Sequence, residues 1–151
     1  MIKFRGKNEK GWHYGPLVIE NNVCRIITTD GFQVKGPYIQ GELYVYGVQT
    51  VDCDSVGQFI LLHDMSGEEI YTGDILQHVD YTFGEIVYYN KSKGRYFGRA
   101  VAFDSLIVNE EINEERVKKM SIVGNVYDNK DVLGNRYDEI LKLVKGGICD
   151  V

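Results

Sequence analysis

Proline, cysteine and long apolar runs are all scarce in this sequence. The sequence has only two prolines. Hydrophobic residues make up 44% of it and charged residues 26%. This is the composition of a globular protein and excludes disordered, collagen-like and coiled-coil chains. No apolar run approaches the ~18 residues of a membrane-spanning helix, and residues 1–7 are too charged for a signal peptide. We therefore expect a cytoplasmic protein with no membrane partner.

Cysteine occurs at only three positions, Cys24, Cys53 and Cys149. Their number is odd, and no two have the Cys-x-x-Cys spacing of zinc knuckles or redox motifs. A chain of 151 residues also buries enough surface to fold without a disulfide or a metal. The sequence therefore predicts three reduced thiols and no disulfide framework.

The sequence also lacks the usual motifs of catalysis and cofactor binding. It has no Gly-x-Ser-x-Gly elbow, no Gly-x-Gly-x-x-Gly loop and no phosphate-binding loop. The histidines, His13, His63 and His78, do not have the spacing of metal ligands. His63-Asp64 resembles an acid–base pair, but adjacent residues diverge in a strand and are solvated in a turn. We expect no enzyme activity, no catalytic residue, no metal site and no cofactor.

Acidic side chains outnumber basic ones, which gives a net charge of −5. Residues 1–55 carry six charges of each sign, so the acidic excess lies in residues 56–151. A net-negative chain repels polyanions at long range. Binding to nucleic acid would therefore need a local basic patch.

Eleven tyrosines, six phenylalanines and 17 glycines predict short strands joined by tight turns. The clearest hairpin joins residues 17–20 to residues 23–27 through Asn21-Asn22, because asparagine tolerates the positive φ of a two-residue turn. Asp30-Gly31 predicts a second turn, and Gly36-Pro37 a strand break. Further strands are predicted at residues 43–46, 57–62, 69–71, 75–79, 84–89, 95–103 and 121–127.

Two segments have helical patterns. Residues 109–119 begin with Asn109, a good N-cap, and their acids precede their bases, as the helix dipole favours. Near the C-terminus, apolar residues recur at helical spacing before Gly146-Gly147; they are Tyr137, Ile140, Leu141 and Val144. We predict an N-terminal β region at 1–54, a second β region at 55–130 and a helical tail at 131–151.

The middle of the chain contains the pattern Asp64-x-x-Gly67-x-Glu69-Ile70-Tyr71-x-Gly73-Asp74-Ile75, preceded by Val56-Gly57-Gln58-Phe59. This pattern resembles the YopX family of small proteins from bacteriophages and prophages of Gram-positive bacteria. The opening residues 2–5 and the segment 122–129 agree with the family's start and closing strand. Ile60-Leu61 departs from the pattern, where the family has Thr-Gly, and Lys130 departs where the family has proline.

The resemblance implies an all-β fold, a phage or prophage origin and no assigned mechanism. We read Asp64, Gly67, Gly73 and Asp74 as structural turn residues, since glycine allows tight turns and aspartate bonds nearby amides. A Gly-Asp-apolar start followed by a Gly-x-Ile-Val strand also opens many small barrels of the Src-homology-3 (SH3) type. The predicted fold is mainly β, with small twisted sheets or an SH3-like barrel in the C-terminal part and a short C-terminal helix.

Residues 88–99 form the best candidate binding surface. This stretch alternates aromatic and basic side chains without one acid, as single-strand nucleic-acid platforms do; the candidate contacts are Tyr88, Lys91, Lys93, Arg95, Tyr96 and Arg99. The alternative is a hairpin whose aromatics enter the core while its lysines solubilise the turn.

Two functions follow from these features. The first is a non-enzymatic phage accessory protein that binds a phage or host protein, or itself as a homo-oligomer. Apolar residues in strands and in the C-terminal stripe favour self-association, notably Tyr38, Tyr44, Val45, Tyr46 and Tyr137. The second is a nucleic-acid-binding module that uses residues 88–99.

Overall fold

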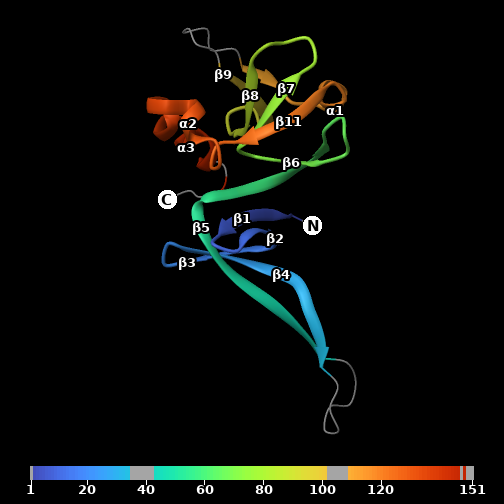
Figure 1. Ribbon diagram of the computed structural model, residues 1–151, viewed down its shortest axis with the longest axis vertical. Helices are drawn as coiled ribbons and strands as arrows, with labels where there is room; N and C mark the ends of the chain where they lie inside the picture. Colours follow the sequence, from blue (N-terminus) through green and yellow to red (C-terminus); the bar gives the residue numbers. More distant parts are fainter. Residues whose placement is uncertain (1, 35–42, 102–108, 147, 149–151) are drawn as a thin grey trace. The chain divides into compact units, whose positions relative to one another are not determined.

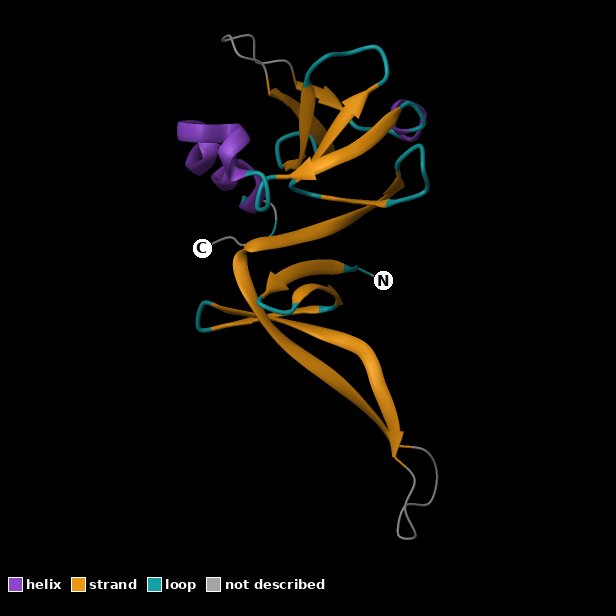
Figure 2. Ribbon diagram, viewed as in Figure 1, coloured by secondary structure: helices purple, strands orange, loops and turns teal. Residues whose placement is uncertain are grey.

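The computed structural model describes residues 2–34, 43–101, 109–146 and 148, and most of them lie in β-strands (Figures 1 and 2). The chain divides into two compact units, residues 1–56 and 57–151. One long strand, β5 (Leu43–His63), contributes residues to both units. None of the described helices is long and apolar enough to cross a membrane.

The N-terminal unit is a sheet in the order β2-β1-β5-β4-β3. Its strands are β1 (Phe4–Asn8), β2 (Gly11–Gly15), β3 (Leu17–Glu20), β4 (Val23–Val34) and the first part of β5. The predicted hairpin is confirmed, because β3 and β4 pair antiparallel around a two-residue turn. Asn21 and Asn22 have φ of 51° and 62° in that turn, which is the conformation that asparagine tolerates.

The second predicted turn is wrong. Asp30-Gly31 lies inside β4, where the pairing with β5 shifts register between Thr28 and Phe32 and then continues. A β-bulge takes up the extra residues without ending the strand. The predicted short strand at 43–46 likewise continues into the rest of β5, and Gly36-Pro37 lies outside the described residues.

The prediction of three reduced thiols is also wrong. Cys24 on β4 and Cys53 on β5 form a disulfide with their Cα atoms 5.4 Å apart. The pairing of β4 with β5 places Cys24 opposite Val51, so Cys53 lies only two residues further along the neighbouring strand. The sequence separation of 29 residues concealed this proximity. Cys149 lies outside the described residues.

The C-terminal unit contains a five-stranded sheet in the order β10-β9-β8-β7-β11. The strands are β7 (Asp74–His78), β8 (Gly84–Asn90), β9 (Arg95–Val101), β10 (Asn109–Glu111) and β11 (Met120–Asn125). A further short strand, β6 (Glu69–Tyr71), pairs with the end of β5. The predicted mainly β fold with small twisted sheets is confirmed, although the described strands form open sheets and no closed barrel.

The helices of this unit are short. They are α1 (Glu114–Val117), α2 (Lys130–Leu133), the 3-10 turn Gly134–Arg136 and α3 (Tyr137–Lys145). The predicted helix at 109–119 is wrong in its start, because Asn109 lies in β10 and pairs with Arg99 of β9. The N-cap is Asn113, whose side chain accepts a hydrogen bond from the Arg116 amide at 2.9 Å. The predicted C-terminal helix is confirmed as α3.

Two hydrophobic clusters form the core of the C-terminal unit. One contains Ile60, Ile70, Leu76, Val87, Ile112, Val117 and Met120. The other joins the sheet to α2 and α3 and contains Ile75, Ile86, Val126, Leu133, Ile140 and Val144. Figure 2 shows α2 and α3 together beside the C-terminal sheet. The apolar stripe of α3 therefore packs on its own chain.

Leu61 has a left-handed backbone conformation in a bulge of β5. Its φ is 66°, and the register with β6 shifts between Phe59 and His63 on either side of it. Its side chain is 72% exposed, so no core packing compensates for the strain. This is the position at which the family pattern has glycine, and the conformation explains why glycine suits it.

We expect Leu61→Gly to raise the free energy of unfolding by about 0.5–1 kcal/mol. A left-handed conformation costs an L-residue roughly 1–2 kcal/mol, and the greater flexibility of unfolded glycine offsets part of the gain. Leu61→Ala is the control, because it retains the strained Cβ and should gain little. Denaturant unfolding of the three proteins measures the difference, and equal stability would contradict the strain.

Candidate functional site

Asp64 is the centre of the hydrogen-bond network in the family signature. Its Oδ1 accepts hydrogen bonds from the Ser66 amide at 2.9 Å, the Ser66 hydroxyl at 2.7 Å and the Glu68 amide at 3.0 Å. Its Oδ2 accepts from the amide of Ile122 in β11 at 3.0 Å. Asp64 is only 7% exposed. The carboxylate therefore organises its own turn and joins it to a strand 58 residues away.

The turn around Asp64 covers the outer edge of β11. This strand ends the five-stranded sheet and pairs on its inner side with β7. On its outer side, the Ile122 amide donates to Asp64, and the Met120 carbonyl accepts from the Met65 amide at 2.9 Å. Exposed edge strands tend to pair with other chains. The signature turn therefore forms hydrogen bonds with one amide and one carbonyl at this edge.

The pKa of Asp64 lies below its usual value of 3.8. Burial alone would raise it, because a charged carboxylate loses solvation. The hydrogen bonds from Ile122, from the Ser66 side chain and from the Glu68 and Ser66 amides outweigh that effect. The network therefore favours the ionised carboxylate.

The second half of the signature joins three strands at the turn before β7. The Gly73 amide donates to the Val87 carbonyl in β8 at 2.8 Å, and its carbonyl accepts from the Val126 amide at 2.8 Å. Gly73 has φ of 90°, which favours glycine. Asp74 is 1% exposed and accepts from the Tyr71 amide at 2.7 Å. Both residues therefore serve the turn.

The closing segment of the resemblance is held in the same way. β11 contains an irregularity between Ile122 and Gly124. A Cβ at Gly124 would clash with the Oδ1 of Asn129, the atom that accepts a hydrogen bond from the Asn125 amide at 3.0 Å. Asn129, which follows β11, therefore binds the backbone at the end of that strand.

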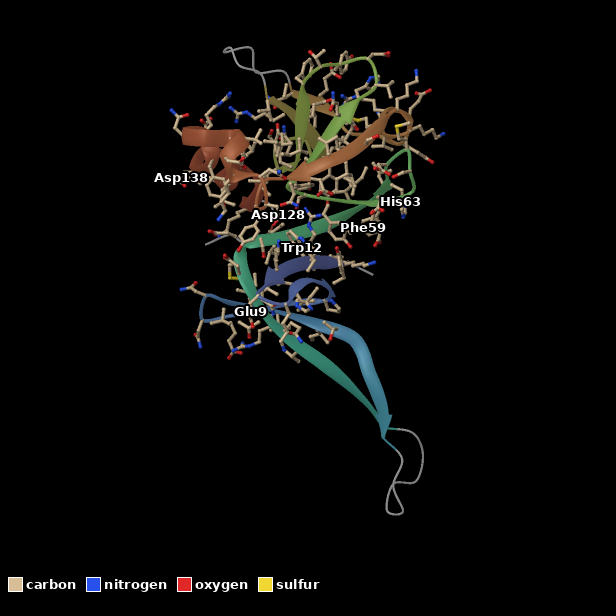
Figure 3. The ribbon with its side chains drawn as sticks, viewed as in Figure 1. Glu9, Trp12, Phe59, His63, Asp128 and Asp138 are labelled. Atoms are coloured by element: carbon tan, nitrogen blue, oxygen red, sulfur yellow. A yellow bond between two sulfur atoms is a disulfide. The ribbon has the colours of Figure 1, made fainter. Side chains whose placement is uncertain are left out.

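His63 and Asp64 do not form an acid–base pair. The carboxylate of Asp64 binds amides and the Ser66 hydroxyl, whereas the ring of His63 lies edge-on to Phe59 with the centroids 5.6 Å apart (Figure 3). Groups of three or more His, Cys, Asp or Glu side chains that could hold a metal do not occur among the described residues.

The aromatic residues of the 88–99 hairpin lie mostly in the core. Tyr88 and Phe97 are 6% and 7% exposed, and the Tyr88 hydroxyl lies 3.2 Å from the Asn109 Oδ1 and donates to it. Tyr96 packs against the first hydrophobic cluster, and burial together with Tyr89 raises its pKa. Tyr89 meets Tyr96 edge-on at 5.2 Å. The face of Tyr88 is thus not exposed for base stacking.

Two of the four basic side chains of the hairpin form ion pairs with acids from other elements. Arg95 lies 3.3 Å from Glu111 in β10, and Arg99 lies 3.1 Å from Glu139 in α3. The side chain of Arg99 is only 13% exposed. Lys91 and Lys93 are exposed at the turn, where the Lys93 ammonium lies 5.2 Å from the ring centroid of Phe97.

A basic residue that the sequence did not associate with the hairpin lies beside it. Lys142 of α3 shares with Tyr89 and Lys91 a shallow cleft of about 390 Å³. Because β8 and α3 are far apart in the sequence, no local pattern indicated that their residues line one cleft. The cleft brings two lysines together with Tyr88 and Tyr89.

A larger groove lies between the sheet and the C-terminal helices. Its volume is about 670 Å³, within the ~300–1,000 Å³ range of ligand pockets. We call it the valine-rimmed groove; it is lined by Ile75, Gln77, Thr82, Phe83, Gly84, Val101, Val123, Asn129, Asp131, Val132, Leu133, Gly134, Arg136 and Ile140. Val123 and Val132 are 55% and 63% exposed. Most of its wall is apolar.

Sequence reasoning missed both this groove and a buried ion pair. Glu85 in β8 is 2% exposed and accepts hydrogen bonds from the Arg116 guanidinium at 2.8 and 2.7 Å. The groove residues come from β7, β8, β9, β11 and the helices. Only the tertiary fold brings them together, so no local pattern could have indicated them.

We expect Asp64→Asn to lower the free energy of unfolding by about 2 kcal/mol near pH 7. The new side-chain NH2 is a donor, so it cannot accept the hydrogen bonds that one carboxylate oxygen accepts in the wild type. A hydrogen bond to a charged group contributes roughly 1.5–3 kcal/mol to stability. Because the folded pKa lies below 3.8, the carboxylate's contribution is present above 3.8 and is lost as the pH falls through the folded value.

Unfolding measured from pH 7 down to pH 2 tests this linkage. The difference between wild type and Asp64→Asn should shrink below pH 3.8, where the native carboxylate also becomes protonated. Glu68→Gln is the control, because Glu68 is an exposed carboxylate in the same turn. A pH-independent difference would contradict the role of the charge.

We expect Gly73→Val to destabilise the protein by about 1–2 kcal/mol or more, because a β-branched residue at φ of 90° is strained. The new Cβ would lie 3.5 Å from Val144, so the backbone rather than a clash causes the loss. Gly73→Asn should lose less, since asparagine tolerates positive φ. Thermal melting of the two variants and of the wild type measures these losses. A Gly73→Val protein that melts at the wild-type temperature would refute the prediction.

Comparison with known proteins identifies the family. The profile described as "YopX protein" matches residues 3–134. No curated protein matches the chain. The crystal structure of protein EF1440 from Enterococcus faecalis is similar, with a TM-score of 0.57 and 21% identity, and covers 89% of this chain and 99% of that one. At this identity, the likeness shows a shared fold. The match over residues 3–134 shows that the chain belongs to the YopX family.

Proposed function

We propose that this YopX-family protein is a non-enzymatic accessory protein of a bacteriophage or prophage. It acts in the host cytoplasm by binding another protein or a second copy of itself. The family membership supports the phage origin. The two aspartates of the signature support a role without catalysis, because Asp64 and Asp74 both accept hydrogen bonds from backbone amides.

The valine-rimmed groove is the observation that carries the proposal of protein binding. Its apolar wall opens to solvent, and the exposed Val123 and Val132 belong to its lining. Apolar surface around a concave site is typical of protein interfaces. A polypeptide partner would bury both valines together with the floor of the groove.

The apolar stripe of α3 no longer supports self-association. Ile140 and Val144 are 2% and 4% exposed because they pack on the sheet of their own chain. The side chains of Tyr38, Tyr44, Val45 and Tyr46 lie outside the part that the structure describes. We therefore place the interface of a homo-oligomer at the valine-rimmed groove. The likeness to SH3-type barrels remains part of this proposal as an analogy of fold.

We expect the double variant Val123→Asp/Val132→Asp to abolish binding. It introduces two charges into a surface that a partner would bury. Val79→Asp is the control, because Val79 is also 60% exposed and does not line the groove. Light scattering measures self-association, and affinity capture during phage growth measures other partners. Binding that survives the double variant, or a wild-type monomer without partners, would contradict the proposal.

Nucleic-acid binding is the second candidate, supported by the cleft that holds Tyr89, Lys91 and Lys142. Cations and an aromatic ring in one cleft suit a single-stranded ligand. The ion pairs of Arg95 and Arg99 and the net charge of −5 make it the weaker candidate.

Retention on heparin at low salt tests the second candidate. If it is correct, the protein is retained, and Lys91/Lys93/Arg95→Ala elutes at lower salt because fewer cations meet the polyanion. Lys118/Lys119→Ala is the control, since it removes two exposed lysines outside the hairpin. A wild-type protein that does not bind heparin would exclude this function.

A further inference from the structure

We infer that Cys24 and Cys53 form a redox-sensitive clamp on the N-terminal unit. The disulfide between them holds β4 against β5, and its reduction loosens residues 1–56 selectively. This inference concerns regulation and does not depend on the proposed binding function.

The described part of the N-terminal unit has few buried apolar side chains. Among the side chains described in residues 2–56, the buried apolar ones are Cys24, Ile26, Val51 and Val56. Both hydrophobic clusters lie instead in residues 57–151. A unit of this size rarely gains enough stability from its core alone and commonly depends on a disulfide, a metal or a partner. The disulfide supplies that constraint here.

The position of the disulfide also makes its contribution large. Cys24 and Cys53 are 29 residues apart in sequence and close a loop that contains most of β4 and the first part of β5. Closing a loop of this length removes much conformational freedom from the unfolded chain. The pair itself contributes to the core, because Cys24 is only 1% exposed.

The two cysteines differ in their exposure to solvent. Cys24 is buried, whereas Cys53 is half-buried and lies opposite the exposed turn at Asn22. An external thiolate therefore reaches the Cys53 Sγ first. It forms a mixed disulfide there, the bond between the two cysteines breaks, and Cys24 leaves as a thiolate that takes up a proton.

A second external thiolate completes the reduction. It attacks the external sulfur of the mixed disulfide and releases the Cys53 thiolate. The two external thiols end as their own disulfide, having supplied two electrons. The reverse reaction closes the clamp with a low-molecular-weight disulfide as the oxidant. Cytoplasmic thiols are normally kept reduced, so the clamp distinguishes a reducing from an oxidising compartment.

The experiment uses the full chain with Cys149→Ser, which removes the third thiol from exchange. The chain has a single tryptophan, Trp12 in β2, so its fluorescence reports unfolding of the N-terminal unit (Figure 3). Hydrogen exchange of the β8 amides reports the C-terminal unit. Both are measured after equilibration with oxidised or reduced glutathione, and free thiols are counted in each sample.

Reduction should raise the equilibrium constant for unfolding of the N-terminal unit roughly 400-fold, because it frees a loop of 29 residues in the unfolded chain. The midpoint of the unfolding transition followed by Trp12 fluorescence should then shift to a lower denaturant concentration. The protection of the β8 amides against hydrogen exchange should stay unchanged. Cys53→Ser should behave like the reduced protein and should not respond to glutathione.

Three results would overturn the inference. The first is two free thiols after equilibration with oxidised glutathione, because the clamp would then not form. The second is an equal Trp12 midpoint in the oxidised and the fully reduced protein. The third is an equal loss of stability in both units. Because the reduced wild-type cysteines are tested directly, the experiment does not depend on the folding of Cys53→Ser.

Discussion

The carboxylate of Asp64 is the interaction on which the C-terminal unit depends most. It is buried and ionised, and it binds three groups of its own turn and one amide of β11. A buried charge is costly unless hydrogen bonds satisfy it. The turn at 64–68 and the edge of β11 must therefore stay together. Gly73 adds the same kind of constraint by bonding Val87 and Val126 from one residue.

This network gives the polar residues and glycines of the family signature a structural role. Asp64, Asp74 and Asn129 all accept hydrogen bonds from backbone amides, and Gly67 and Gly73 have positive φ. The signature thus defines an architecture. The surfaces proposed for binding lie elsewhere, in the valine-rimmed groove and in the cleft that Tyr89, Lys91 and Lys142 line.

Local patterns in the sequence predicted the local structure well. The Asn21-Asn22 hairpin, the glycine turns and α3 each depend on residues close in the chain. The errors concern contacts between distant residues. The predicted turn at Asp30-Gly31 lies inside β4, because β4 continues to pair with β5 beyond it. The same pairing places Cys24 beside Cys53. The acids that pair with Arg95 and Arg99 likewise come from β10 and α3. No pattern within residues 88–99 could indicate them.

Hydrogen exchange at the Ile122 amide tests the central claim most directly. Ile122 lies in an edge strand, and its amide donates to the Asp64 side chain. If Asp64 holds the turn on β11, this amide should exchange as slowly as the amides paired between β7 and β8, and Asp64→Ala should make it fast. An Ile122 amide that exchanges as quickly as an exposed edge amide in the wild-type protein would contradict the account.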